Sequence, residues 1–250
     1  MTVAEPQTHQ ESQLRELWKQ AFGDSDAFLD GFFATGFAPQ RCRCITWNDR
    51  VAAALYWFDC LWEGKKLAYI YAVATAEDFR GKGFCRKLME DTHRHLESLG
   101  YAGCVLVPGS RSLFDMYEKM GYRSFSPRLW QEMTAGEKGQ VRALTPQEYA
   151  RKREKRLPAG AVIQEGAALS YLATFAGFYE SDGCLFCGGG ENVFLFQEFF
   201  GSMEQVPGLL AALGAAAGRV PIPGEGQDYA MFCPLTDSEE IPGYFGLALN

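Results

Sequence analysis

The sequence predicts a mixed α/β fold of the α+β kind, a mostly antiparallel sheet flanked by helices, with a smaller α+β segment packed on it at the C-terminal end. Apolar residues recur at helical spacing over residues 11–22 and again over 84–99. Between these two segments, residues 41–75 form three extended apolar runs separated by turn residues. Strands followed by helix, strand, helix and strand are typical of a domain that mixes both kinds of element.

The first elements are two helices and a meander. Residues 11–22 carry their apolar side chains on one helical face, namely Leu14, Leu17, Trp18 and Phe22. A second helix is expected over residues 26–33. Residues 41–75 then form three successive antiparallel strands, because Asn48-Asp49 and Glu63-Gly64-Lys65 are turn signals.

The next elements complete a first domain over residues 1–143. A helix begins after Gly83 and stops near Gly100, where glycine allows the chain to leave the helix. Residues 101–109 are then expected to form a strand, residues 111–120 a helix closed by Gly121, and residues 122–133 one further strand.

Residues 144–160 are expected to form a linker helix, with Thr145 as N-cap and Pro146 at its first position. Five of the six residues from 151 to 156 are basic. Such a run can bind nucleic acid, but a solvated connecting helix is favoured because the rest of the chain is acidic.

Residues 161–250 predict a smaller C-terminal α+β domain. Helices are expected at 169–179 and 206–218, a hairpin of strands at 184–187 and 192–200, and late strands at 228–235 and 244–250. This part is small for an independent domain, so we expect it to pack on the first. A degenerate second copy of the first domain is one interpretation, although no tandem repeat is evident.

The composition limits the function. The net charge of −7 argues against general nucleic-acid binding, which needs a basic surface. No apolar run reaches 18 residues, so no membrane span is expected, and the polar N-terminus does not resemble a secretory signal. These features predict a cytoplasmic protein. The sequence carries no signal for an oligomeric state.

The eight cysteines are expected to be reduced thiols that serve as small apolar residues. Cys42 and Cys44 together with Cys184 and Cys187 suggest a four-thiolate zinc site. However, Cys184 and Cys187 lie three apart on an expected strand and would point to opposite faces. No metal is therefore expected.

The most informative segment is Arg80-Gly81-Lys82-Gly83, between an apolar extended run and an amphipathic helix. The start of a helix carries unpaired N–H groups and a partial positive charge, and glycines let these groups approach an anion. The segment therefore predicts a phosphate site. A P-loop does not fit, because Gly83 follows Lys82 where Ser or Thr is needed, and a dinucleotide fingerprint lacks its third glycine at Arg86.

The stretch VATAEDFRGKGFCRKLM, residues 73–89, resembles the acetyl-coenzyme A signature R/Q-x-x-G-x-G/A of the GCN5-related N-acetyltransferases. Arg80 and Gly83 occupy two of its defined positions, and Cys85 stands where Gly or Ala is usual. The stretch SRSLFDMYEKMGYRSF, residues 110–125, resembles the later family segment N-x-x-A-x-x-x-Y-x-x-x-G-F. Tyr117 and Gly121 are in register, while three positions differ: Ser110, Leu113 and Tyr122. The resemblance covers about residues 3–135.

The resemblance implies an acetyl-CoA-dependent N-acetyltransferase that acts on a primary amine of a small molecule or peptide by direct attack, without an acyl-enzyme. It implies that the cofactor contacts nine residues: Val73, Thr75, Arg80, Gly81, Lys82, Gly83, Phe84, Cys85 and Ser110. Tyr117 is the implied general acid, and its alternative role is helix packing. A catalytically silent acyl-CoA-binding regulatory module is the alternative function.

Several groups are open as the base that accepts the ammonium proton. Some family members use a Glu where this chain has Leu67. Tyr69 and Tyr71 share a face with Val73 in a regular strand, whereas Glu77 and Asp78 are expected to cap the loop. The carboxylate of Asn250 is a further candidate. The weak candidates are histidines: His9 lies in a polar stretch, and His93 and His95 are expected on the polar side of their helix.

Overall fold

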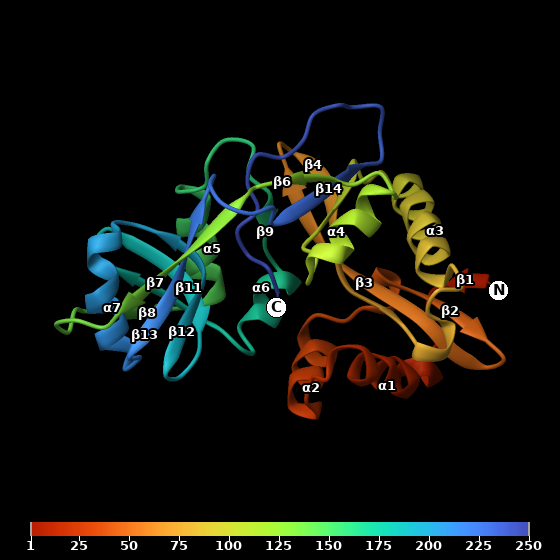
Figure 1. Cartoon of the computed structure of the whole chain (residues 1–250), viewed down its shortest axis with the longest axis horizontal. Helices are drawn as coiled ribbons and strands as arrows, with labels where there is room; N and C mark the ends of the chain where they lie inside the picture. Colours follow the sequence, from red (N-terminus) through yellow and green to blue (C-terminus); the bar gives the residue numbers. More distant parts are fainter. Residues whose placement is uncertain (1, 250) are drawn as a thin grey trace. The chain divides into compact units, whose positions relative to one another are not determined.

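The computed structural model describes residues 2–249, and the chain divides into two compact units (Figure 1). Unit 1 comprises the residues up to Arg123 together with Met231–Ile241. Unit 2 comprises Ser124–Ala230 together with the residues from Pro242 onward. Each unit is therefore built from two separate segments, and the segments of the two units alternate along the chain.

Unit 1 is a sheet flanked by helices. Its strands follow the order β1-β2-β3-β4-β5-β14. All pairs are antiparallel except β4 with β5, which is parallel. The elements are β1 Thr2–Ala4, η1 Thr8–Gln10, α1 Glu11–Phe22, α2 Asp26–Thr35, η2 Pro39–Arg41, β2 Cys42–Trp47, β3 Arg50–Trp62, β4 Lys65–Thr75, η3 Glu77–Phe79, α3 Phe84–Ser98, β5 Gly103–Leu106, α4 Arg111–Glu118 and β14 Ala230–Pro234.

The predicted helices and meander of unit 1 are confirmed. α1 has the expected bounds, α2 extends the second helix to Thr35, and β2, β3 and β4 are the three successive strands. Both turns use backbone with positive φ, at Asn48 and Asp49 and at Glu63 and Gly64. Two such residues in a two-residue loop match the right-handed twist of a hairpin.

Helices cover both faces of this sheet. On one face, Trp18 of α1 and Phe32 of α2 pack against Tyr56 of β3. On the other face, Leu88 of α3 and Phe114 of α4 belong to the same buried core as the strands. Alternating side chains of β3 and β4 therefore pack into two separate cores, one on each face of the sheet.

The single strand expected over residues 122–133 is wrong. It is broken into β6 Arg123–Phe125 and β7 Arg128–Thr134. Ser126 has φ 53° and is followed by Pro127, which has no N–H to donate to a sheet. Unit 2 begins at Ser124, just before this break.

The two units therefore divide the chain differently from the expected segments 1–143, 144–160 and 161–250. The expected linker helix is α5 Pro146–Glu154, and Thr145 is its N-cap as predicted. It belongs to unit 2, because its Arg153 side chain is buried and the preceding β8 Arg142–Leu144 pairs with β10.

Unit 2 is a second sheet with the strand order β7-β13-β12-β11-β10-β8. Its core contains Phe186, Phe194 and Phe196 of the sheet and Leu209 of α7. The remaining elements are β9 Ile163–Gln164, α6 Ala167–Leu172, β10 Gly177–Ser181, β11 Cys184–Gly189, β12 Val193–Phe200, η4 Met203–Gln205, α7 Val206–Leu213 and β13 Ala217–Pro223. The expected helices at 169–179 and 206–218 are thus shorter, and residues 244–249 form no strand.

Unit 2 repeats the strand order of unit 1. In each unit three antiparallel strands lead through a helix to a fourth strand that is parallel to the third. These are β2-β3-β4, α3 and β5 in unit 1, and β10-β11-β12, α7 and β13 in unit 2. In each, the fourth strand has an antiparallel strand as its other neighbour, β14 or β7.

Residues 244–249 are buried in unit 2 and are held there by polar side chains. The Arg128 guanidinium donates to the carbonyls of Phe245 (3.0 Å) and Gly246 (2.9 Å). The Tyr244 hydroxyl donates to Glu198 at 2.9 Å. These contacts replace the sheet hydrogen bonds that a strand would have made.

Across the part of the chain that the structure describes, no helix combines the length and apolar character needed to span a bilayer.

Candidate functional site

The central feature of the site is the second half of β4, which has a neighbour on one side only. β4 pairs with β3 from Lys65 to Thr75. Its parallel pairing with β5 covers only Leu67–Tyr69. Beyond Tyr69 the strand therefore has backbone groups that β5 does not satisfy. Val73 and Thr75, the expected backbone partners of the cofactor, both lie in this half, which pairs with β3 but not with β5.

A β-bulge lies in the same half of β4. The register with β3 shifts between Ala54 and Tyr56, and Ala72 on β4 has φ 48°. Bulges re-aim the backbone and reset the alternation of side chains.

The bulge corrects one expectation. Tyr71 packs on Trp18 of α1, with ring centroids 5.6 Å apart, whereas Val73 packs against the core on the α3 side. Tyr69 and Tyr71 therefore do not share a face with Val73. The error arose because the expectation assumed a regular strand.

The loop after β4 has the geometry of an anion site. Gly81 and Gly83 have φ of 72° and 80°, and a Cβ at either position would meet no atom within 4 Å. Gly83 is the N-cap of the 15-residue helix α3, and no side chain caps this end. The first N–H groups of α3 are thus available to a ligand, and the helix dipole favours a negative one.

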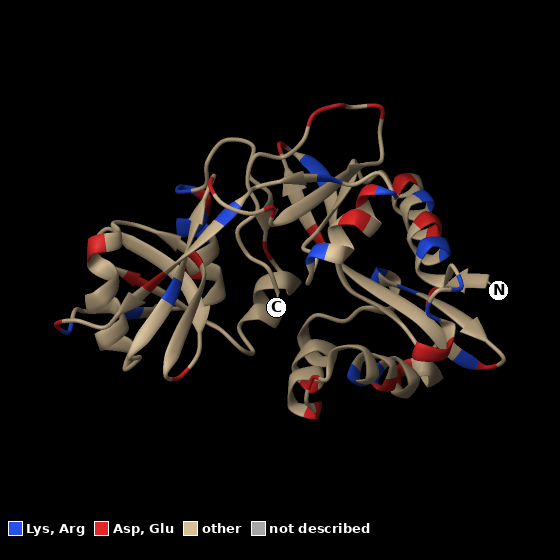
Figure 2. Cartoon of the chain, viewed as in Figure 1, with Lys and Arg blue, Asp and Glu red and all other residues tan. Residues whose placement is uncertain are grey.

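Basic side chains surround this loop, although α3 as a whole carries both signs of charge (Figure 2). Arg80 folds back, and its Nε donates to the Thr75 carbonyl at 3.2 Å. Lys82 is exposed and has no carboxylate partner among residues 2–249. Arg50 of the neighbouring hairpin pairs with Asp78 at 2.9 Å. The ion pair fixes the segment that leads into the loop.

The remaining expected cofactor residues differ in what they can offer. The Phe84 ring is buried against Phe79, with centroids 4.9 Å apart, so only its backbone faces the loop. Cys85 is half-buried, and burial raises the pKa of its thiol. Ser110 is exposed at the start of α4, with its Oγ 3.1 Å from that of Ser112.

Tyr117 is buried on α4, at 6% exposure. Its ring meets Tyr122 edge-on, with centroids 5.6 Å apart. Among residues 2–249 its hydroxyl makes no hydrogen bond. Burial raises the pKa of Tyr117, and the nearby Cys85 thiol raises it further. The fold thus brings together Tyr117 and Cys85 from the two sequence motifs, and it keeps the phenol protonated at neutral pH.

The structure places the candidate bases as follows. Leu67 is fully buried in β4. The ring centroids of Tyr69 and Tyr71 lie 6.1 Å apart, within the aromatic cluster under α1 and α2. Asp78 pairs with Arg50, and the expected capping of the loop by Glu77 and Asp78 is wrong, because no side chain caps η3 or α3 within residues 2–249. Asn250 lies outside the described residues.

The histidines of α3 are not on its polar side. His93 Nε2 lies 2.9 Å from the Tyr122 hydroxyl, and burial lowers the pKa of His93 to about 4. His95 faces Trp57, with ring centroids 6.2 Å apart. Sequence reasoning missed the His93–Tyr122 pair. Its signal was the tyrosine at 122, where the family usually has Phe.

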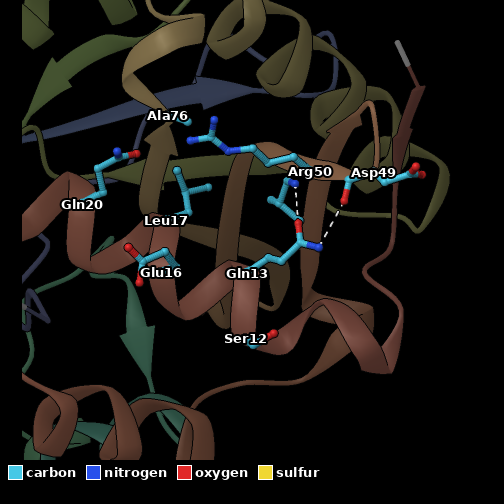
Figure 3. A pocket seen from close by; sticks show the side chains of 9 residues that line it. Ser12, Gln13, Glu16, Leu17, Gln20, Asp49, Arg50 and Ala76 are labelled. Atoms are coloured by element: carbon cyan, nitrogen blue, oxygen red, sulfur yellow. Dashed lines mark hydrogen bonds between the residues drawn. The ribbon is translucent and has the colours of Figure 1, made fainter.

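A cleft of about 320 Å³ lies between α1 and the β2–β3 hairpin (Figure 3). Gln13 crosses it: its Oε1 accepts from the Val51 N–H at 2.7 Å, and its Nε2 donates to the Asp49 carbonyl at 3.1 Å. The side chains that line the cleft are mostly exposed and polar. Its clearest role is to hold the hairpin against α1.

Two other sequence features have structural roles. In the basic run of residues 151–156, Arg153 is buried against Glu198 at 2.6 Å, Lys152 pairs with Glu180 at 2.8 Å, and Arg156 donates to the Gly183 carbonyl at 2.7 Å. The eight cysteines are all free. Within residues 2–249, no three His, Cys, Asp or Glu side chains gather as metal ligands would.

Residues 2–125 match the sequence model of the acetyltransferase (GNAT) domain. No curated protein matches the chain.

Solved structures share the fold over nearly the whole chain. A GCN5-related N-acetyltransferase from Anabaena variabilis aligns with a TM-score of 0.68 at 16% identity, covering 94% of this chain and 73% of that one. Its counterpart from Kribbella flavida gives 0.69 at 16%, covering 92% and 70%. A tandem GNAT protein from the clavulanic acid biosynthesis pathway gives 0.56 at 12%, covering 94% and 98%. At these identities the likeness concerns the fold, and it confirms the α+β prediction.

Proposed function

Because residues 2–125 belong to the GNAT family of acetyltransferases, we propose that the chain is an acetyl-CoA-dependent N-acetyltransferase that acts on a primary amine of a small molecule or peptide. The observation that carries the proposal is the half of β4 that lacks a partner on its β5 side, next to the start of α3, which no side chain caps. Together they offer one extended backbone partner and one anion site, which is what a pantetheine arm joined to a diphosphate requires.

In this proposal the chain positions the donor through its backbone. The N–H groups that follow Gly83 bind the diphosphate, with Arg80 and Lys82 adding positive charge. Val73 and Thr75 pair with the pantetheine amides as an added strand would. A backbone N–H near Val73, re-aimed by the bulge, is the donor to the thioester oxygen.

The transfer itself needs no covalent enzyme intermediate. The amine nitrogen bonds to the acetyl carbon as the carbon–sulfur bond breaks, and the thiolate takes a proton from the Tyr117 hydroxyl. The proton lost from the amine passes to water, from which Tyr117 is restored. Burial keeps the phenol protonated at neutral pH, and because its pKa is raised, this role depends on its position and not on its acidity.

Unit 2 is proposed to hold no cofactor, so the chain would bind one. β12 also loses its parallel partner after Leu195. There, however, Arg128 bridges the Gln197 carbonyl (3.3 Å) to the C-terminal segment. The loop that follows, residues 201–205, has Glu204 and no basic residue. The slot used in unit 1 is thus occupied by the chain itself in unit 2.

The test is calorimetry with coenzyme A, followed by thiol release from acetyl-CoA with a panel of amines. We expect saturable binding at one coenzyme A per chain and thiol release with some amines. No binding at low salt would overturn the proposal, and two sites would overturn the assignment of unit 2. Binding without release across the panel would favour the silent regulatory module, a reading that the uncharged Leu67 on β4 keeps open.

A further inference from the structure

The β2–β3 hairpin carries a large exposed aromatic side chain next to the anion loop. Trp47, the last residue of β2, is 43% exposed. Its indole meets the Phe84 ring edge-on, with centroids 6.3 Å apart and planes at 79°. Phe84 is the first residue of α3, the helix whose N–H groups face the loop. The indole therefore lies beside the proposed diphosphate site.

The hairpin is held in place from two sides. Gln13 of α1 bonds to the backbone of Asp49 and Val51, as Figure 3 shows. Arg50 pairs with Asp78 at 2.9 Å, immediately before the loop. An exposed side chain on a tip that is anchored in this way is positioned before any ligand arrives, which reduces the entropy lost on binding.

The surroundings of this indole are both aromatic and basic. The Arg50 guanidinium and the Lys82 amine each lie 5.9 Å from the centroid of the Phe79 ring. Phe79 in turn contacts Phe84. On a chain with a net charge of −7, basic groups gathered around exposed aromatic surface match a planar base that carries phosphates.

The other exposed apolar side chains of unit 1 do not have this setting. The large ones among the described residues are Phe22, Leu61, Leu99 and Ile241. Leu99 follows the opposite end of α3, and Leu61 precedes the turn at the other end of β3. Trp47 is the one that touches the helix start where the phosphate loop ends.

We propose that Trp47 is the stacking surface for the adenine of coenzyme A, with Lys82 facing the phosphates next to it. The inference rests on the proposed function, because it places the diphosphate at the Gly83 loop. One ribose joins that diphosphate to the base, so the base lies within reach of the hairpin. Stacking on an aromatic face accounts for an indole left exposed at this point.

Two acetyl donors test the proposal. Acetyl-CoA carries the nucleotide, whereas S-acetyl-4′-phosphopantetheine does not. For Trp47→Ala we expect the KM for acetyl-CoA to rise about tenfold while the KM for the truncated donor stays within about twofold. Trp47→Phe should recover most of the difference, and Leu99→Ala, which removes an exposed apolar side chain from the far end of α3, should change neither.

A binding measurement makes the test independent of turnover. Adenosine 3′,5′-bisphosphate should quench indole fluorescence in the wild-type protein, and Trp47→Phe should abolish the quenching while the protein stays folded by circular dichroism. An equal rise of both KM values in Trp47→Ala would reduce Trp47 to a support for Phe84. Unchanged KM values in Trp47→Ala, together with quenching that persists in Trp47→Phe, would remove Trp47 from the site. Failure of the proposed function is distinct, because the wild type would then neither bind coenzyme A nor release thiol.

Discussion

Replacing Tyr117 with Phe removes one oxygen atom from the centre of the proposed site and nothing else. The tyrosine is 6% exposed, and its hydroxyl makes no hydrogen bond within residues 2–249. Removal of a hydroxyl that lacks a protein partner leaves no other group unsatisfied. We therefore expect the free energy of unfolding to change by less than about 0.5 kcal/mol.

The effect on catalysis should be much larger. A positioned general acid contributes about 10²- to 10⁴-fold, so kcat should fall by at least about 100-fold, or roughly 2.7 kcal/mol in the barrier. The affinity for coenzyme A should stay within about twofold, because the ring that packs on Tyr122 is retained. Thiol release under saturating acetyl-CoA measures kcat, and calorimetry measures the affinity.

Tyr122→Phe is the matched control for Tyr117→Phe. Its hydroxyl hydrogen-bonds to His93 at 2.9 Å, so its loss should cost about 1 kcal/mol of stability. Because it holds no place in the proton transfer, kcat should fall by less than about threefold. If Tyr117→Phe keeps its kcat, or loses coenzyme A affinity in step with kcat, Tyr117 is a packing residue and the proposed acid is wrong.

Three further perturbations follow from the structure. Gly83→Glu should abolish coenzyme A binding by repelling phosphate, whereas Gly64→Glu, which places the same side chain at a similar φ (74°) in a turn far from the loop, should bind normally in calorimetry. Burial lowers the pKa of His93 to about 4, so the unfolded chain takes up a proton on this histidine at a higher pH than the folded chain does. The free energy of unfolding should therefore fall as the pH drops from about 6.5 to 4, by at most about 3 kcal/mol. His93→Gln should flatten that part of a urea-unfolding pH series, and an unchanged slope would contradict the assignment. Glu198→Gln should destabilise unit 2 by about 3–5 kcal/mol in urea unfolding, because it leaves Arg153 buried without its counter-charge. Glu180 is partly exposed, so Glu180→Gln should cost less than about 1 kcal/mol. Equal losses in the two variants would refute the role of burial.

The parts of the fold that could be predicted from sequence are those whose causes are local. The meander followed from apolar runs interrupted at Asn48-Asp49 and Glu63-Gly64, where both turns need positive φ. The anion loop followed from Gly83 at the start of an amphipathic helix. In each case neighbouring residues determine the backbone, and distant contacts only confirm it.

The parts that were missed depend on distant partners. Nothing near Met231 indicates that its strand pairs with β5, more than a hundred residues earlier in the chain. The bulge at Ala72 arises from register with β3 and not from a glycine, so the faces of Tyr71 and Val73 were assigned wrongly. The burial of His93 needed Tyr122, which comes from a different element.

The third strands of the two units, β4 and β12, have the same pairing but different surroundings. Both have a third strand that loses its parallel partner part of the way along. Only in unit 1 does that opening lead to basic residues, Arg80 and Lys82, beside the αL glycines Gly81 and Gly83. In unit 2 the opening leads to Glu204. There the buried Arg128 donates hydrogen bonds to three backbone carbonyls, those of Gln197, Phe245 and Gly246. A guanidinium buried without a carboxylate is costly unless its donors are satisfied. The C-terminal segment supplies two of those carbonyls, so it stabilises unit 2 beside the half of β12 that has no parallel partner.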